Sequence, residues 1–500
     1  LWKPPGGTFR GGAEVRSAQF RGTLGPSPIS IAAGRIRFAL EGPALSATDV
    51  DVRLGREEWV HRLEINELTG RFNAAGAFGR FNGLSGQVAR VPLLLGEGSG
   101  SWRVQRGDLL VEGRILVSDA RDPPRFHPLV SDDFRLTLAD KQIRAAGWLK
   151  HPASGIRVTR ATIHHDLRNE AGRAVLEVPG IRFALDGLQP EDITPLSVGV
   201  VALVEGTVTG RGEVNWRPGS TSSSGTFSTE NMNLAASFGP VEGLTTTIRF
   251  TDLLNLVSAP GQVAEVDLIR AGIDVADGVI RYQLLPDSHV RIEGGRWPLA
   301  GGELLLEPTL LDFGQPSTKF LTFEVIGLDA ARFVSQLGIS SIALTGTFDG
   351  VLPMRFDVRG GHIVGGKLQA RPGGGTLSYV GVVSDADLGT YGRLAFDALK
   401  SLRYSYFLVE LDGALAGEFL TRIQLHGVTV ANRDHWLVRQ FANLPFRFNI
   451  AIRGPLRAVI ATARATSDPT LLIQPVLPEE LRDLPTTVTT IRKEESETQR

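Results

Sequence analysis

Cysteine is absent from all 500 residues of the sequence. This absence excludes a disulfide framework and a thiolate metal site, and it suits a chain exported to an oxidising compartment. Long apolar runs are missing as well, because the best one, residues 196–204 (LSVGVVALV), is far shorter than a membrane span. No charged segment leading into an apolar one follows Leu1, so we expect any targeting or anchoring segment to lie upstream of it.

An excess of charge of one sign is also missing. The 53 basic residues nearly cancel the 54 acidic ones, and the net charge is -1. The basic residues are scattered among acidic ones and are not interleaved with aromatic side chains, so nothing indicates a nucleic-acid partner. With only 5 Tyr and 7 Trp, the chain has few residues for the aromatic girdles of a membrane barrel.

Catalytic motifs are scarce. The sequence contains no G-x-S-x-G, S-x-x-K or G-x-G-x-x-G. Residues 361–367 (GHIVGGK) match the start of a phosphate-binding loop, but Leu368 stands where Ser or Thr would hold a metal, and no helix can begin in QARPGGG. We predict hairpins there instead, with one turn at Gly360 and Gly361 and a second, two-residue turn at Gly365 and Gly366. The chain is predicted to be neither an enzyme nor a cofactor-binding protein.

Two groups of residues are of types that bind metals, but their surroundings in the sequence do not fit a metal site. Glu58 and His61 match the Glu-x-x-His spacing of carboxylate-bridged metal sites, which need a second copy and four facing helices. His164, His165 and Asp166 are adjacent, and adjacent residues on a strand point to opposite faces. We therefore predict no metal site.

Glycine and proline are abundant, with 58 and 28 residues, and they divide the chain by turns. Between the turns, apolar and polar residues alternate, which is typical of strands with one wet face. We predict twenty-odd strands of about five or six residues, joined as antiparallel hairpins. The alternation is clear in VDVRL (residues 50–54), GIRFALDG (180–187), VIRYQL (279–284), KFLTFEV (319–325), RIQLHG (422–427) and FRFNIAIRG (446–454).

Helices are predicted only at residues 328–337 and 391–402, with at most one helical turn at residues 190–196. Polar breaks fall at residues 118–128, 186–197 and 217–225. The second break is the preferred boundary. It divides the chain into a segment of repeated hairpins at 1–190, a groove domain at 191–485 and a polar tail at 486–500.

Strands with one apolar face can pack as β-sandwiches, close into a membrane barrel or remain an open groove. The alternation alone does not choose between sandwiches and a groove.

From about Val204 onward the sequence resembles the YdbH family of AsmA-like proteins, a group that includes TamB- and YhdP-type envelope proteins. The resemblance is carried by an ordered series of segments: GTVTGRGEVNW (206–216), SSGTFSTENMNLAASFGPVEGLTTTIRFTDL (223–253), PGQ (260–262), AGIDVADGVIRYQL (271–284), RIEGGRWPLAGGELLLEP (291–308), GLDAARFV (327–334), LTGTFDGVLPMRF (344–356), GGHIVGGKLQARPGGGTLSY (360–379) and FDALKSLRYSYFLVELDGAL (396–415).

The resemblance implies an all-β fold, in which an elongated, twisted antiparallel sheet is curled lengthwise into an apolar groove. It implies a bridge across the periplasm of a diderm bacterium that carries phospholipids between the inner and outer membranes. The inner membrane would hold it through an upstream helix, and a small outer-membrane lipoprotein would be its partner. The family has also carried a dicarboxylate-transport label, but no ordered set of Arg or Lys here would bind such a ligand.

A lipid groove needs a continuous apolar lining, and a sandwich core would use the same residues. The alternative function is a structural or adhesive string of β-sandwich domains without lipid cargo. Near the C-terminus, residues 486–492 (TTVTTIR) have the β-branched content of an edge that could accept a partner's strand, and a disordered tail is the alternative. The candidate lining residues are Ile181, Phe183, Leu185, Ile280, Tyr282, Leu284, Val290, Ile292, Trp297, Leu299, Leu304, Leu306, Leu321, Phe323, Val325, Ile423, Leu425, Phe446, Phe448, Ile450 and Ile452.

Overall fold

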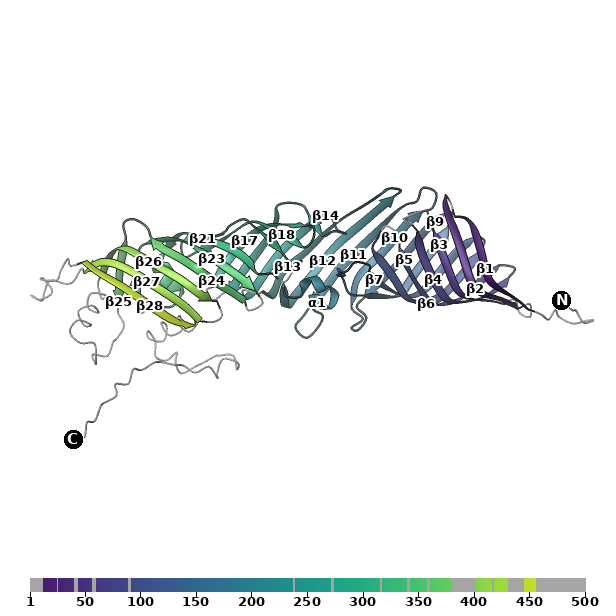
Figure 1. Ribbon diagram of the computed structural model, residues 1–500, viewed down its shortest axis with the longest axis horizontal. Coiled ribbons are helices and arrows are strands. Elements are labelled where there is room, and N and C mark those ends of the chain that lie inside the picture. Colours follow the sequence, from purple (N-terminus) through teal and green to yellow (C-terminus); the bar gives the residue numbers. More distant parts are fainter. Residues whose placement is uncertain are drawn as a thin grey trace, which may run out of the picture.

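In the computed structural model, the described strands of the protein form one antiparallel sheet of 28 strands. The sheet is drawn out along one axis, with β1 (Gly12–Leu24) and β28 (Pro445–Pro455) at opposite ends (Figure 1). The predicted all-β fold is confirmed, and a string of separate two-sheet sandwiches does not agree with a single sheet. The structure describes residues 12–24, 26–39, 44–55, 60–88, 91–236, 239–270, 274–314, 317–339, 342–357, 360–379, 402–415, 418–429 and 445–455.

In the N-terminal half each strand pairs with the next one along the chain, so the sheet grows as a simple meander. These strands are β2 (Ser27–Ala39), β3 (Ala44–Leu54), β4 (His61–Asn73), β5 (Gly76–Val88), β6 (Leu93–Gln105), β7 (Asp108–Asp119), β8 (Leu129–Ala139), β9 (Gln142–Lys150), β10 (Arg157–Asp166), β11 (Ala171–Phe183), β12 (Val201–Arg217), β13 (Ser220–Ala236) and β14 (Gly239–Asp252).

In the C-terminal half short strands interrupt the meander. β14 pairs with both β15 and β16, β18 pairs with β19 and β20, and β22 and β25 form a side ladder against β26. The strands are β15 (Val257–Ser258), β16 (Gln262–Arg270), β17 (Asp274–Leu285), β18 (His289–Leu299), β19 (Gly302–Leu306), β20 (Thr309–Asp312), β21 (Lys319–Asp329), β22 (Ile342–Leu344), β23 (Thr347–Asp357), β24 (Gly360–Ala370), β25 (Gly375–Tyr379), β26 (Leu402–Ala414) and β27 (Glu418–Thr429).

Most strands are longer than predicted, because irregularities such as β-bulges occur within them where turns were expected. β1 has 13 residues and β12 has 17, because glycine and polar residues inside the strands form bulges rather than turns. In β2, the apolar residues Ala33 and Ile36 lie three residues apart, and pairing to β3 skips Gly34 and Asp49 between them. Asp49 has a φ of 56°, and a Cβ on Gly34 would lie 2.9 Å from its carboxylate. Because one residue is skipped on each strand, the register is kept and the apolar side chains on either side of the irregularity stay on one face.

Gly365 illustrates the same device and corrects one prediction. The two-residue turn at Gly365 and Gly366 is wrong, because β24 runs through both residues. Gly365 has a φ of +63°, its N–H donates to Asp412 of β26 at 3.0 Å, and the register with β26 shifts between Ile363 and Gly366. The phosphate-loop reading stays excluded, because a strand and not a helix follows Lys367.

The helical elements are short. The predicted helix at 328–337 is confirmed as α2 (Ala330–Gln336), whose N-terminus is capped by Asp329 accepting from the N–H of Arg332 at 2.9 Å. The predicted turn at 190–196 is α1 (Pro190–Ile193), followed by the 3₁₀ turn η1 (Pro195–Ser197). The predicted helix at 391–402 lies outside the described residues except for Leu402, which begins β26. Neither described helix has the length and apolar run that crossing a bilayer requires.

The expected boundary near residue 190 coincides with α1 and η1. The strands on either side of it, β11 and β12, pair with each other, so the sheet continues past this point. The division into residues 1–190, 191–485 and 486–500 therefore remains a prediction about sequence segments. The tail lies outside the described residues.

Candidate functional site: an apolar inner face

One face of the sheet is apolar from its first strand to its last, and we call it the inner face. Residues directly opposite each other on antiparallel strands share a face, so the register traces it. One row of paired neighbours runs Phe20, Ile31, Val52, Leu63, Gly86, Leu95, Val117, Leu129. A second runs Ile181, Val208, Thr229, Thr246, Ala264, Ile280, Gly295, Leu306, Phe323, Leu352. A third runs Leu304, Val325, Gly350, Leu368, Val409, Ile423, Ile450.

The opposite, outer face carries charge. Arg53 and Asp51 of β3 form an ion pair at 2.9 Å, and Arg270 and Glu242 form another at 3.0 Å between β16 and β14. These side chains are well exposed, so the pairs contribute little to stability. In these strands the charged residues thus lie on the face opposite the apolar rows, as the alternation predicts.

Most candidate lining residues lie on this inner face. They include Ile181, Phe183, Ile280, Tyr282, Leu284, Val290, Ile292, Trp297, Leu299, Leu304, Leu306, Leu321, Phe323, Val325, Ile423, Leu425, Phe448 and Ile450. The backbones of Phe446 and Ile452 pair with Gly427 and Thr421 in β27. The expected strand extension to Leu185 is wrong, because β11 ends at Phe183 and Leu185 is 57% exposed in the connection that follows.

The inner face is not equally open along its length. Seven candidate side chains on the inner face are buried by other protein atoms: Ile181, Phe183, Trp297, Leu299, Leu306, Val325 and Leu425. Ile450, in contrast, is 36% exposed. Apart from the exposed Leu185, the others in the candidate set with described side chains are half-buried. In the part of the chain that the structure describes, no second sheet covers these half-buried residues, which is what an open groove requires.

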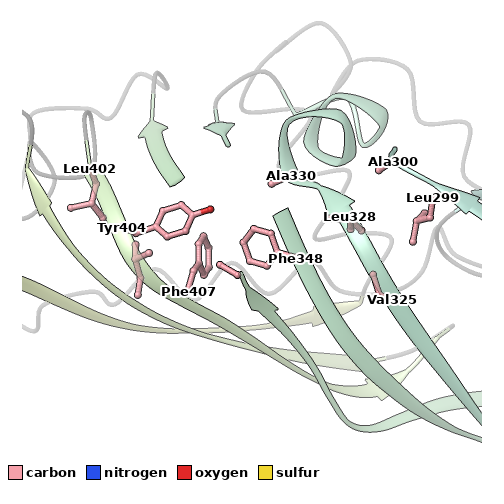
Figure 2. Packing of buried hydrophobic residues seen from close by; sticks show 11 residues of the cluster. Leu299, Ala300, Val325, Leu328, Ala330, Phe348, Leu402, Tyr404 and Phe407 are labelled. Atoms are coloured by element: carbon pink, nitrogen blue, oxygen red, sulfur yellow. The ribbon is translucent and has the colours of Figure 1, made fainter. Parts of the chain in front are cut away.

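The largest buried cluster lies where α2 packs against the inner face (Figure 2). Phe348 and Phe407 meet edge to face with centroids 5.4 Å apart, and Tyr404 meets Phe407 in the same way at 5.1 Å. Phe333 of α2 packs against this cluster. Burial raises the pKa of Tyr404 to about 12, so its hydroxyl stays protonated and donates to the carbonyl of Thr345. Here the groove is filled by the chain itself.

Trp297 marks a second filled position. Its ring lies over Gly278 of β17, where a Cβ would be 1.9 Å from Nε1, and its centroid is 6.0 Å from that of Phe323. Its Nε1 is buried and has no hydrogen-bond partner among the described residues. The absence of a side chain at Gly278 is therefore what lets the indole lie flat on the sheet.

Unlike Trp297, two other polar aromatic side chains on the inner face have hydrogen-bond partners beside them. The Tyr282 hydroxyl is 3.0 Å from Oγ1 of Thr246, and burial raises the pKa of this tyrosine. Trp216 Nε1 donates to Nδ1 of His165 at 3.1 Å, with the two rings stacked. In the part of the chain that the structure describes, no three His, Asp or Glu side chains gather as a metal site would need. The face offers apolar contact rather than a reacting group.

Two polar breaks that the sequence suggests as boundaries meet in space. The segment 120–128, between β7 and β8, lies against α1 and η1. The N–H of His127 donates to the carbonyl oxygen of Ile193 at 2.8 Å, and Oγ1 of Thr194 donates to that of Arg125 at 2.6 Å. Phe126 and Ile193 pack on a buried cluster that contains Ile181. Sequence reasoning missed this contact, because 69 residues separate Thr194 from Arg125.

An elongated single sheet with a continuous apolar face and a charged back defines an all-β groove protein. The chain belongs to the YdbH-like family, described as intermembrane phospholipid transport protein YdbH, whose profile matches residues 6–477. The resemblance noted from about residue 204 onward is thereby confirmed and extends almost to the N-terminus. No curated protein and no solved structure matches the chain.

Proposed function

We propose that this protein carries the acyl chains of phospholipids along its inner face, across the periplasm between the inner and outer membranes. The observation that supports this most is the apolar inner face that continues from β1 to β28, on a sheet whose first and last described strands do not pair with each other. Membership of a family of intermembrane phospholipid transport proteins supports the cargo class.

The energetic reason is the cost of exposing an acyl chain to water. At roughly 0.8 kcal/mol per CH₂, a chain of about sixteen carbons costs on the order of 13 kcal/mol. Aliphatic and aromatic side chains along the inner face remove most of this cost at every step. They hold the lipid by many weak contacts rather than in one deep pocket, so the lipid can move on.

The ends of the sheet suggest how the bridge is attached. An upstream helix in the inner membrane would anchor the N-terminal end. Among the described strands β28 pairs only with β27, so its other edge, or residues 486–492 beyond it, could accept a strand from an outer-membrane lipoprotein.

The test is lipid content. Protein purified from membranes in mild detergent is extracted with organic solvent, and the extract is analysed by mass spectrometry beside a known lipid carrier. We expect phospholipid in both extracts. Recovery from the carrier but none from this protein would overturn the proposal.

A further inference from the structure

Two loops far apart in the sequence lie at opposite long edges of the sheet. Strands β7 and β14 are separated by seven antiparallel pairings, so they run in opposite directions and end at opposite edges. We call these edges the β7 rim and the β14 rim, and residues 120–128, which follow β7, the strap. The loop after β14 spans residues 253–256.

The strap touches the opposite rim. Nη1 of Arg125 donates to the carbonyl oxygen of Leu254 at 2.6 Å, and Nη2 of Arg121 donates to Oδ1 of Asn255 at 2.5 Å. Since these partners belong to the two rims, the mouth of the groove is bridged at this point. A single hydrogen bond from Ser27, on the β7 rim, to Glu170, on the β14 rim, bridges it at a second point.

The strap is held firmly to its own rim. Nε and Nη2 of Arg125 donate to the two carboxylate oxygens of Asp119, both at 2.7 Å, and the N–H of Arg125 donates to the same carboxylate. The side chain of Asp119 is 0% exposed and that of Arg125 is 14% exposed. This two-point pairing fixes the guanidinium so that its remaining nitrogen faces Leu254.

The opposite loop is also preformed. Asp252 accepts from Ser223 at 2.7 Å and from the side-chain amide of Asn255 at 2.6 Å, and the N–H of Leu254 donates to Ser223 at 2.9 Å. Each rim therefore keeps its shape without the other. Only the two arginine contacts cross between strap and loop among the described hydrogen bonds.

The strap matters for transport because a phospholipid has a polar head group as well as acyl chains. If acyl chains travel along the inner face, as the proposed function holds, the polar head group moves in water along the mouth of the groove. The strap lies across that path, and its underside is filled by Phe126 packed on the inner-face cluster. A charged head group cannot pass through that apolar contact without losing its hydration.

We propose that the strap is a latch, which opens by breaking the contacts of Arg121 and Arg125 to the β14 rim each time a lipid head group passes. The latch divides the inner face into an N-terminal section, from β1 to β7, and a C-terminal section beyond β14. This inference rests on the proposed function, because the latch needs to open only for a cargo that has a polar end. Its few crossing bonds allow release, and the Asp119–Arg125 pair keeps the guanidinium in position to bind Leu254 again.

A reversible cross-link tests the latch directly. The chain has no cysteine, so Arg121→Cys with Asn255→Cys introduces one pair across the mouth. A short, reducible bismaleimide joins the two rims in cells. The matched control is Ser228→Cys with Thr247→Cys, a directly paired and exposed position on the outer face, where the same reagent joins neighbouring strands without crossing the mouth.

A photo-crosslinking amino acid replaces either Phe38 in the N-terminal section or Ile450 in the C-terminal section, both on the inner face. Its crosslinks to labelled phospholipid show whether lipid reaches that side of the strap. We expect cross-linking of the rims to abolish lipid labelling at one of the two sites. The reducing agent should restore that labelling. In the outer-face control, both sites should be labelled before and after cross-linking. Asn255→Ala, which removes an exposed crossing contact, should speed the appearance of label at the second site.

Equal labelling at both sites with the rims linked would overturn the latch and leave the proposed function intact, since lipid would then pass beneath a fixed bridge. Absence of label at both sites before linking would overturn the proposed function, and the latch with it.

Discussion

Phe320 and Phe323 lie three residues apart on β21 and point to opposite faces of the sheet. Phe320 is 65% exposed and pairs with Arg355 of β23 on the outer face. Phe323 pairs with Leu352 of β23, and its ring lies beside Trp297 on the inner face. One strand therefore carries two large aromatic residues with different surroundings, which makes it a direct test of which face is used.

Phe323→Glu should remove lipid from the purified protein and stop transport, because it places a carboxylate in the path of the acyl chains. Burying such a charge costs several kcal/mol unless it is paired. The measurement is phospholipid per protein by mass spectrometry, together with circular dichroism to show that the sheet is retained. We expect a several-fold loss of lipid.

The control for this change is Phe320→Glu, which adds the same charge to the same strand on the outer face. It should leave lipid content and transport unchanged. If the two variants lose lipid equally, the assignment of cargo to the inner face is wrong.

Arg125→Leu should destabilise the middle of the sheet. It leaves the fully buried carboxylate of Asp119 without its ion-pair partner, and breaking a buried pair typically lowers the free energy of unfolding by about 3–5 kcal/mol. Urea denaturation followed by tryptophan fluorescence measures the change. Arg53→Leu, which breaks an exposed pair, is the control and should leave the midpoint where it is. Equal midpoints for the two variants would mean that the strap contributes nothing to stability.

The Asp119 pair should also make stability depend on pH in acid. Burial raises the pKa of Asp119, but hydrogen bonds from Arg125 and Arg121 outweigh it and hold the pKa below the ordinary 3.8. The unfolded chain therefore takes up the proton first, so the stabilisation is complete above pH 3.8 and is lost as pH falls through the lower folded-state pKa. The difference in urea midpoint between the natural chain and Asp119→Asn should be constant above that pH and shrink below it. A difference that grows in acid would contradict the assignment.

Gly278→Ala should destabilise the protein, because the new methyl group would meet the indole of Trp297 at 1.9 Å from Nε1. Overpacking of this kind costs typically about 1–3 kcal/mol. Thermal unfolding measures it. The matched variant is Gly96→Ala, also within a strand, where an added Cβ meets nothing within 4 Å and no loss is expected. A change at Gly278 no larger than at Gly96 would show that the indole moves aside freely.

The alternation of side chains was enough to predict the class of fold and one apolar face. In KFLTFEV and RIQLHG, every residue predicted to share a face does so in the sheet, because a strand turns its side chains by half a revolution per residue. The shared face of most candidate lining residues could be predicted in this way, whereas a role for them in holding lipid remains a prediction. Strand length could not, since a glycine inside a bulged strand and a glycine in a turn look alike in the sequence.

Gly365 is the clearest case of that ambiguity. Two adjacent glycines between two short strand-like segments favour a tight hairpin by local chemistry alone. The hydrogen bond from Gly365 to Asp412, 47 residues later, decides for a bulge in a continuous strand. No local pattern contains that information, because the competing pairing is supplied by a distant strand.

The amino-acid sequence by itself determined an all-β chain with one apolar and one charged face, since the period of a strand is a local property of the backbone. Only the tertiary structure decided that the strands join into one sheet, where α2 and the strap fill its inner face, and that Arg125 reaches the opposite rim. Those features depend on curvature accumulated over many strands, which brings together residues that are far apart along the chain.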